Sequence, residues 1–239
     1  MSMHREYIVW DSPTLGRKME MLWFGGAGYP MIWFPTSAGR FYQTEDFGLI
    51  GAVGDRIDAG SLQVFCVDSV DAESFYAKSR APAERIRRHD QYDRYLTAEV
   101  VPFLRSKARH EGRIGTLGAS FGAYHAVNYG FRHPDLVDKV VGFSGKYDIH
   151  SFLDGYWDEL CYFHCPTAYV PNMNGDWIGK LSAMDICVVT GATDNILTGT
   201  VDMLRILKEK GIRNRGRVWE APYGHDWPWW KVQVRSYVP

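Results

Sequence analysis

Two short runs of consecutive apolar residues restrict the possible folds of this chain more than any other feature. The runs are Val64-Phe65-Cys66-Val67 and Ile186-Cys187-Val188-Val189. Strands that are apolar on both faces are typical of a parallel sheet with helices covering each side. Parallel neighbours need long crossover connections, and helix-length segments separate the later strand-like runs of this chain. The sequence therefore predicts an α/β fold around a buried, mainly parallel sheet.

Eight segments have the composition of strands, and the early ones lie close together, as at an antiparallel edge. We predict strands at Glu6–Trp10, Lys18–Trp23, Pro30–Phe34, Leu62–Val67, Arg113–Leu117, Lys139–Phe143, Met184–Thr190 and Arg217–Glu220. The run Gly25-Gly26-Ala27-Gly28 lacks the Lys-Ser/Thr of a phosphate-binding loop and is expected to form a hairpin turn. With intervening helices, this order predicts a three-layer α/β sandwich whose eight-stranded, mostly parallel sheet has an antiparallel N-terminal edge.

Apolar residues at helical spacing locate the helices. A stripe at i, i+3 and i+4 predicts one helix from Tyr92 to Leu104, which Pro102 should kink or restart. Further helices are expected at Ala123–Arg132, Thr198–Lys210 and Trp227–Tyr237. Gly211 follows the second of these as a C-terminal stop, and Pro228 is tolerated in the first turn of the third.

Charge and length exclude several classes of protein. The 239 residues carry 27 basic and 28 acidic side chains, a formal net charge of −1. This balance provides no field to attract nucleic acid or an acidic membrane, and no apolar run approaches the roughly 20 residues of a membrane-spanning helix. No repeat or linker divides the chain, so we expect one domain over residues 1–239. The first ten residues do not resemble a secretory signal.

The four cysteines form neither a disulfide framework nor a recognisable metal site. Cys66 and Cys187 lie within apolar runs, where reduced and buried thiols are usual. Cys161 and Cys165, with His164 between them, lack the second pair of ligands that a structural zinc site needs. We therefore expect no metal, no cofactor and a cytoplasmic location.

Gly118-Ala119-Ser120-Phe121-Gly122 is a G-x-S-x-G pentapeptide between a predicted strand and a predicted helix. So tight a turn strains the backbone of the serine and crowds the residues two before and two after it, and glycine relieves that crowding. The turn raises the Ser120 hydroxyl above the sheet, and the free Phe121 N–H at the helix start is placed to stabilise an oxyanion. We predict that Ser120 is a nucleophile and Phe121 an oxyanion donor; the simpler alternative is a loop serine flanked by glycines.

A serine nucleophile needs a base within hydrogen-bonding distance, and in this topology the acid and then the histidine follow the serine along the chain. His225 lies in a loop after the last predicted strand, so we predict that it is the base. His4 lies in the N-terminal tail, and the remaining histidines are expected to be surface or packing residues: His89, His110, His125, His133, His150 and His164.

The acid should follow the strand before the last one. Asp194 lies there, in Gly191-Ala192-Thr193-Asp194-Asn195, and is predicted to orient the imidazole and to stabilise its protonated form. A helix-capping role for Asp194 is the alternative, and Asp148 and Asp202 are the alternative acids. The second oxyanion donor should come from Pro35–Arg40 after the third strand, which lacks the His-Gly-Gly pattern of many lipases. A main-chain N–H from residues 36–38 suffices, and we choose Ser37, although a plain polar loop is the alternative.

Three segments together resemble the esterase D-like "putative esterase" family of α/β-hydrolases. They are Gly118–Gly122, Glu99–Leu104 and the run Gly224-His225-Asp226-Trp227-Pro228-Trp229-Trp230. The similarity extends over most of the chain from about residue 30. It implies an α/β-hydrolase fold and a Ser-His-Asp hydrolase of carboxylic esters or thioesters, with some members of the family acting as acyltransferases. The chain departs from the family at residues 35–40, which form the oxyanion loop.

Residues 146–180 contain eight large aromatic side chains and are predicted to cap Ser120 with a shallow aromatic pocket. They are Tyr147, Phe152, Tyr156, Trp157, Tyr162, Phe163, Tyr169 and Trp177. An extra packing layer is the alternative. The sequence as a whole predicts a cofactor-independent serine carboxylesterase that hydrolyses small-molecule esters with short acyl groups through an acyl-enzyme intermediate. A thioesterase or acyltransferase with the same residues, or a non-catalytic binding protein of the same fold, are the alternatives.

Overall fold

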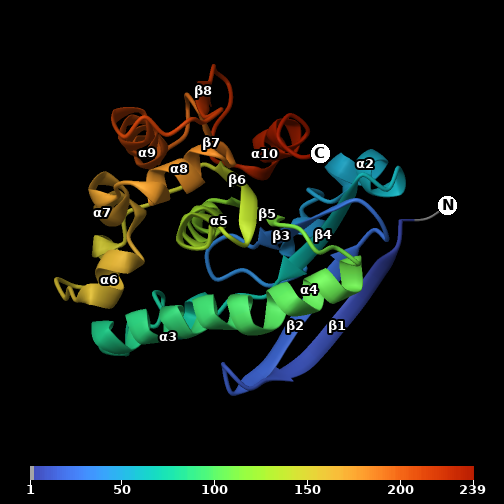
Figure 1. The fold of residues 1–239 in the computed structure, drawn as a ribbon, viewed down its shortest axis with the longest axis horizontal. Coiled ribbons are helices and arrows are strands. Elements are labelled where there is room, and N and C mark those ends of the chain that lie inside the picture. The colour runs from blue at the N-terminus through green and yellow to red at the C-terminus, as the bar shows by residue number, and fades with distance from the viewer. Residues whose placement is uncertain (1–2) are drawn as a thin grey trace.

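An eight-stranded sheet runs through the molecule in the order β1-β2-β4-β3-β5-β6-β7-β8 (Figure 1). The computed structural model describes residues 3–239. β1 pairs antiparallel with β2, and β2 pairs antiparallel with β4, whereas every later pair is parallel. The predicted mostly parallel sheet with an antiparallel N-terminal edge is therefore confirmed. The strands are β1 (Arg5–Ser12), β2 (Arg17–Phe24), β3 (Tyr29–Phe34), β4 (Leu62–Val67), β5 (Ile114–Ala119), β6 (Val137–Phe143), β7 (Asp185–Gly191) and β8 (Arg217–Trp219).

The predicted hairpin turn at Gly25–Gly28 is wrong, because β4 lies between β2 and β3. The glycine-rich loop instead carries the chain past the start of β4. A Cβ on Gly28 would lie 2.3 Å from the carbonyl carbon of Ser61, and its φ of 98° also favours glycine. β3 then pairs in parallel with β4 on one side and with β5 on the other.

Helices cover both faces of the sheet, which confirms the three layers (Figure 1). The apolar sides of α3, α4, α5 and α9 pack on one face, and those of α2 and α10 pack on the other. The helices of these two layers are α2 (Gly54–Asp58), α3 (Pro82–Tyr95), α4 (Val101–Ala108), α5 (Phe121–Arg132), α9 (Leu197–Glu209) and α10 (Trp227–Val234). Shorter helical segments are α1 (Gln43–Asp46), η1 (Gly51–Val53), η2 (Asp71–Glu73), η4 (His150–Phe152), α6 (Glu159–Phe163), α7 (Pro166–Tyr169), η5 (Val170–Asn172) and α8 (Asp176–Ser182).

The helix predicted at Tyr92–Leu104 begins earlier than its apolar stripe, at Pro82. Between α3 and α4, the residues of η3 (Leu96–Val100) form a π-helical turn, in which the Val101 N–H donates to the Leu96 carbonyl. Pro102 lies in the first turn of α4. The α-helix therefore restarts at Val101 with Pro102 in its first turn, where the missing proline N–H costs no helical hydrogen bond, and the predicted restart is confirmed.

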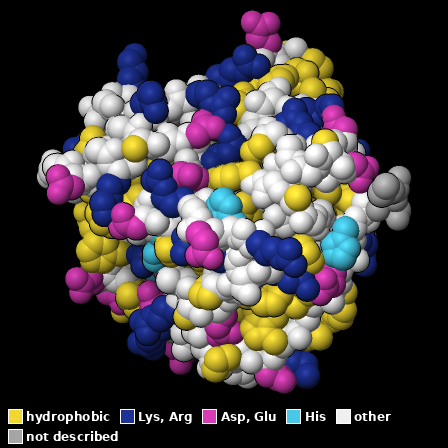
Figure 2. Space-filling model, turned by 45° about the vertical axis from the view of Figure 1, so that its right-hand side comes forward, with side chains coloured by type: hydrophobic (Ala, Val, Ile, Leu, Met, Phe, Trp, Pro, Cys, Tyr) yellow, Lys and Arg dark blue, Asp and Glu magenta, His cyan; other side chains and the backbone are white. Residues whose placement is uncertain are grey.

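The surface mixes charges of both signs. On the face in Figure 2, lysine and arginine side chains are interspersed with aspartate and glutamate. Within residues 3–239, none of the helices has the length and apolar character needed to cross a membrane.

Candidate active site

Ser120 lies in a sharp turn between the end of β5 and the start of α5. Its φ of 56° and ψ of −123° are strained for a residue with a side chain. A Cβ on Gly118 would lie 2.1 Å from the Gly122 carbonyl oxygen, and a Cβ on Gly122 would lie 2.4 Å from the Pro35 carbonyl oxygen. Both glycines of the motif are therefore required by close backbone contacts, one within the turn and one between the turn and the end of β3.

The structure brings Ser120, His225 and Asp194 together at the carboxyl ends of the parallel strands. The His225 Nε2 lies 3.0 Å from the Ser120 Oγ, and the His225 Nδ1 lies 3.1 Å from the Asp194 Oδ1. Asp194 follows β7, and His225 lies in the loop between β8 and α10. The imidazole packs edge-on against Trp230, with ring centroids 5.1 Å apart.

Asp194 is held as a buried carboxylate. Its Oδ2 accepts a hydrogen bond from the Thr190 hydroxyl at 2.8 Å, and its Oδ1 accepts one from the Ile196 N–H at 2.8 Å. Burial alone raises the pKa of this carboxyl, but hydrogen bonds from His225, Ser144, Ile196 and Thr190 outweigh burial and lower the pKa to about 2. The group is therefore ionised at neutral pH and available to a protonated imidazole.

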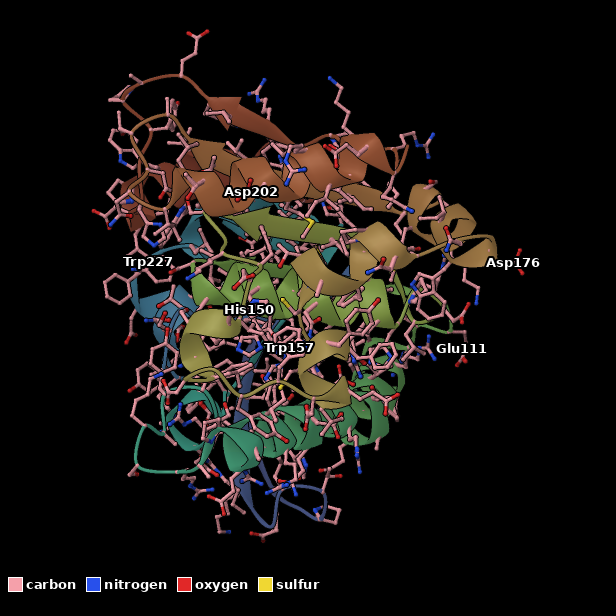
Figure 3. The ribbon with its side chains drawn as sticks, turned by 90° about the vertical axis from the view of Figure 1, so that its left-hand side faces the viewer. Glu111, His150, Trp157, Asp176, Asp202 and Trp227 are labelled. Carbon is pink, nitrogen blue, oxygen red and sulfur yellow. The ribbon has the colours of Figure 1, made fainter. Side chains whose placement is uncertain are left out.

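The two alternative acids lie elsewhere. Asp148 contacts the His150 Nδ1 at 2.9 Å and accepts a hydrogen bond from the Thr167 hydroxyl at 3.3 Å. Asp202 is exposed on α9, as Figure 3 shows, and its carboxylate lies 3.9 Å from the Arg205 guanidinium. Of the three candidate acids, Asp194 is the one that contacts His225.

Both predicted oxyanion donors lie beside the turn. Phe121 is the first residue of α5, where a backbone N–H has no helical partner. In the loop after β3, the Thr36 N–H donates to the Gln43 Oε1 at 2.8 Å and the Ala38 N–H donates to the Asp71 Oδ2 at 3.1 Å. Among the described residues, these bonds leave the Ser37 N–H between them without a hydrogen-bond partner.

The Ser37 side chain faces an aromatic cluster next to the nucleophile. Burial raises the pKa of Tyr76, and the Ser37 side chain opposes part of that rise. The Tyr76 ring packs edge-on against Phe121 at 5.5 Å between centroids, and Phe152 packs against both rings at 5.4 and 5.2 Å. Phe152 belongs to residues 146–180, so this segment does approach the nucleophile.

Most other aromatic residues of 146–180 lie away from Ser120. Tyr162, Phe163, Tyr169 and Trp177 line a separate cavity of about 440 Å³ beside Arg132, at the far end of α5. Figure 3 shows His150 and Trp157 close together, and their rings stack at 4.1 Å between centroids. Phe152 is therefore the aromatic residue of this segment that packs against Phe121 beside the nucleophile, whereas the four residues around the cavity line a separate space.

Three of the histidines expected to be surface or packing residues are buried: His89, His125 and His164. The His89 Nε2 lies 2.9 Å from the Tyr124 hydroxyl, and the His164 Nε2 lies 3.2 Å from Asp90. Their partners lie on other segments of the chain and could not be identified from sequence. The sequence also did not single out Thr190 and Ser144, which hold the acid, because their role depends on contacts between separate segments.

The predicted absence of a metal site concerned Cys161, His164 and Cys165, and these three do not converge. Within residues 3–239, the one group with metal-ligand spacing consists of Asp148, His150 and Cys165. Burial raises the pKa of the Cys165 thiol, which disfavours the thiolate that a metal binds. The four cysteines are free thiols.

A sequence model of the family described as "Putative esterase" matches residues 12–237. The chain belongs to this family. The match begins nearer the N-terminus than the resemblance noted from about residue 30. As a member of this family, the protein is a carboxylic ester hydrolase. No curated protein sequence is significantly similar to it.

Several solved structures share the fold of this esterase. A ferulic acid esterase is 17% identical with a TM-score of 0.81, and the alignment covers 100% of this chain and 98% of that chain. The S-formylglutathione hydrolase FrmB from Staphylococcus aureus is 14% identical with a TM-score of 0.71, covering 99% and 96%. A CE1 ferulic acid esterase from Anaeromyces mucronatus is 12% identical with a TM-score of 0.75, covering 100% and 90%. The predicted α/β-hydrolase fold is therefore confirmed.

Proposed function

We propose that this esterase is a serine carboxylesterase in which Ser120 is the nucleophile, His225 the general base and Asp194 the orienting acid. The observation that carries the proposal is the continuous chain of hydrogen-bonding atoms from the Ser120 Oγ through both imidazole nitrogens to the Asp194 carboxylate. A serine hydroxyl needs such a base because it is a weak nucleophile at its own pKa.

In the first half-reaction, the Ser120 oxygen attacks the ester carbonyl while the His225 Nε2 takes its proton. The carbonyl oxygen becomes an oxyanion, which the Phe121 and Ser37 N–H groups stabilise. The imidazolium then protonates the departing alcohol, and the C–O bond to it breaks, leaving an acyl group on Ser120. In the second half-reaction, His225 takes a proton from water while the water oxygen attacks the acyl-enzyme. The imidazolium then protonates the Ser120 oxygen as its bond to the acyl carbon breaks, which releases the acid product and restores the free serine and neutral histidine.

The ionised Asp194 fixes the tautomer that leaves the His225 Nε2 free to accept a proton, and it stabilises the imidazolium without itself being protonated. The Asp194 pKa of about 2 supports this role, since the carboxylate keeps its charge throughout the cycle.

The proposed substrates are small-molecule esters with short acyl groups. The support is the packing of Phe152 and Tyr76 around Phe121, which limits the space on that side of the nucleophile. The similar structures include a ferulic acid esterase and an S-formylglutathione hydrolase, so both oxygen esters and thioesters belong in the substrate panel. The four free cysteines support a cytoplasmic location.

The test is labelling by a fluorophosphonate probe together with hydrolysis of p-nitrophenyl acetate. Ser120→Ala and His225→Ala should each abolish hydrolysis, and the double variant should be scarcely worse, because the residues act as a unit. Substantial turnover by a folded Ser120→Ala protein would overturn the mechanism. An acyltransferase would label equally but transfer the acyl group to an added alcohol in preference to water.

Asp194→Asn should lower kcat by about 10⁴-fold, as loss of the orienting carboxylate does in serine proteases. Asp148→Asn and Asp202→Asn are matched controls, because neither carboxylate contacts His225. A larger loss from Asp148→Asn than from Asp194→Asn would show that the acid is wrongly assigned.

A further inference from the structure

Beneath the candidate site lies a buried pair of ionisable residues, Asp71 and His125. The His125 Nε2 lies 2.8 Å from the Asp71 Oδ1. Asp71 has no exposed surface and His125 is 3% exposed. A buried carboxylate is costly unless hydrogen bonds satisfy it, so both of its oxygens need partners.

The second oxygen of Asp71 has its partner in the oxyanion loop. The Asp71 Oδ2 accepts the Ala38 N–H at 3.1 Å, and Ala38 directly follows Ser37. Ala38 has a φ of 51°, an uncommon conformation that needs support from its surroundings. Asp71 therefore fixes the peptide next to the proposed second oxyanion donor.

His125 connects this pair to the first oxyanion donor. It lies four residues after Phe121 on α5, so the two side chains lie on the same face of the helix. Their rings pack edge-on at 4.9 Å between centroids. His125 also stacks on Phe34 at 5.6 Å, at the end of the strand that leads into the oxyanion loop.

We propose that Asp71 and His125 are positioning residues that set the separation between the two oxyanion donors. One end of the pair is rigidly attached to the helix that carries the Phe121 N–H, and the other holds the loop that carries the Ser37 N–H. An oxyanion hole lowers a barrier only when both donors already point to the position of the developing charge. The inference rests on the proposed serine mechanism and adds residues that do not themselves touch the substrate.

The test compares two variants of Asp71 in the full chain. Asp71→Ala removes the acceptor of the Ala38 N–H, and we expect kcat for p-nitrophenyl acetate to fall about 10²-fold with little change in KM, the loss typical of a donor misplaced by about 1 Å. Asp71→Asn keeps an oxygen for Ala38, and its amide donates to His125 in the opposite tautomer. This conservative variant should therefore recover kcat to within about tenfold of wild type. Inhibition by a trifluoromethyl ketone, whose adduct places an oxyanion in the hole, should weaken in parallel with kcat.

Asp93→Ala is the matched control. Asp93 is also buried and contacts a histidine at the end of the same helix, with the Nε2 of His133, which directly follows α5, 2.8 Å from its Oδ1, but this pair lies about two turns beyond His125. If Asp71 serves only the stability of the fold, Asp71→Ala and Asp93→Ala should both lower the melting temperature, and the two variants should have similar kcat values. Selective loss of kcat in Asp71→Ala supports the proposal, and equal kcat values in the two variants overturn it.

A second pair of variants covers the case in which Asp71→Ala does not fold. His125→Phe removes the hydrogen bond to Asp71, whereas the His125→Gln amide reaches the same position and keeps it, so kcat should fall in the first and recover in the second. If both Asp71→Ala and His125→Phe fail to fold while Asp93→Ala folds, the pair is a requirement of the fold and the proposal is wrong. Ser120→Ala is measured alongside: a wild-type protein without Ser120-dependent hydrolysis contradicts the proposed function, independently of the Asp71 result.

Discussion

The close approach between Gly122 and the end of β3 makes Gly122→Ala a sharp test of the site geometry. An added Cβ would lie 2.4 Å from the Pro35 carbonyl oxygen and 2.8 Å from that of Phe34. Ordinary van der Waals contact begins at 3.4 Å, so the shorter contact falls about 1 Å short. Both neighbours are backbone atoms, which cannot rotate away. The chain entering the oxyanion loop or the first turn of α5 must therefore shift by roughly that amount.

A shift of about 1 Å between catalytic groups typically costs about 10²-fold in rate, so kcat should fall by that factor. The overpacking itself should destabilise the fold by about 1–3 kcal/mol. For a chain of this size, that lowers the melting temperature by about 2–12 °C. The assays are steady-state hydrolysis of p-nitrophenyl acetate and thermal unfolding followed by circular dichroism.

The control for this substitution is Gly179→Ala. Gly179 lies within α8, and an added Cβ there meets no atom within 4 Å. Alanine in a helix is favoured over glycine by about 0.5–1 kcal/mol, so this variant should be slightly more stable and fully active. A Gly122→Ala protein with wild-type kcat would refute the reasoning, because it would mean that the loop and the helix do not need their present separation.

Three further outcomes are expected. Along a p-nitrophenyl ester series, kcat/KM should favour acetyl to butyryl over lauroyl or palmitoyl esters, since each methylene adds about 0.8 kcal/mol only while the pocket has room; a rate that climbs through lauroyl would contradict the short pocket. Phe152→Ala should move the preferred chain length upward, because it removes the ring that packs 5.2 Å from Phe121; an unmoved optimum would show that Phe152 does not limit the pocket. Burial alone raises the pKa of Asp185, but contacts with Arg215 and Lys139 lower it to about 2 from the usual 3.8, so its contribution to stability is complete above about pH 4 and is lost as the pH falls toward 2. Chemical unfolding of wild type and Asp185→Asn across that range should show the two converging, and a stability difference that persists at pH 2 would contradict the assignment.

The strands and the three converging side chains could be predicted from sequence because their signals are local. Every predicted strand overlaps an observed one, and Ser120, Asp194 and His225 each lie in the turn or loop that follows a predicted strand. In a parallel sheet, residues at the carboxyl ends of different strands meet at one edge, so correct strands bring these residues close together. The order of the strands carries no such local signal. The same glycine-rich segment at residues 25–28 fits a hairpin or a crossing past β4 equally well.

The placement of residues 146–180 was beyond reach for a related reason. Aromatic composition indicates burial but not against which element. Tyr162 and Trp177 line a cavity at the far end of α5, whereas Phe152 packs near its start, beside Phe121. The two ends of a twelve-residue helix are about 18 Å apart, so one aromatic-rich segment contacts both ends of the helix.

The Asp71–His125 pair shows how far sequence alone can go. Residues Phe121 to Phe131 of α5 are all buried, so the helix has no solvent-facing side on which His125 and Asn128 could be hydrated. Polar side chains in such a helix require buried partners, and that requirement can be read from the sequence once the helix is known to lie inside the fold. The identity of the partner cannot be read from the sequence, because Asp71 lies 54 residues from His125 and follows a different strand. Only the folded geometry shows that one Asp71 oxygen contacts the His125 imidazole while the other accepts the Ala38 N–H, and the proposed positioning role rests on this double contact.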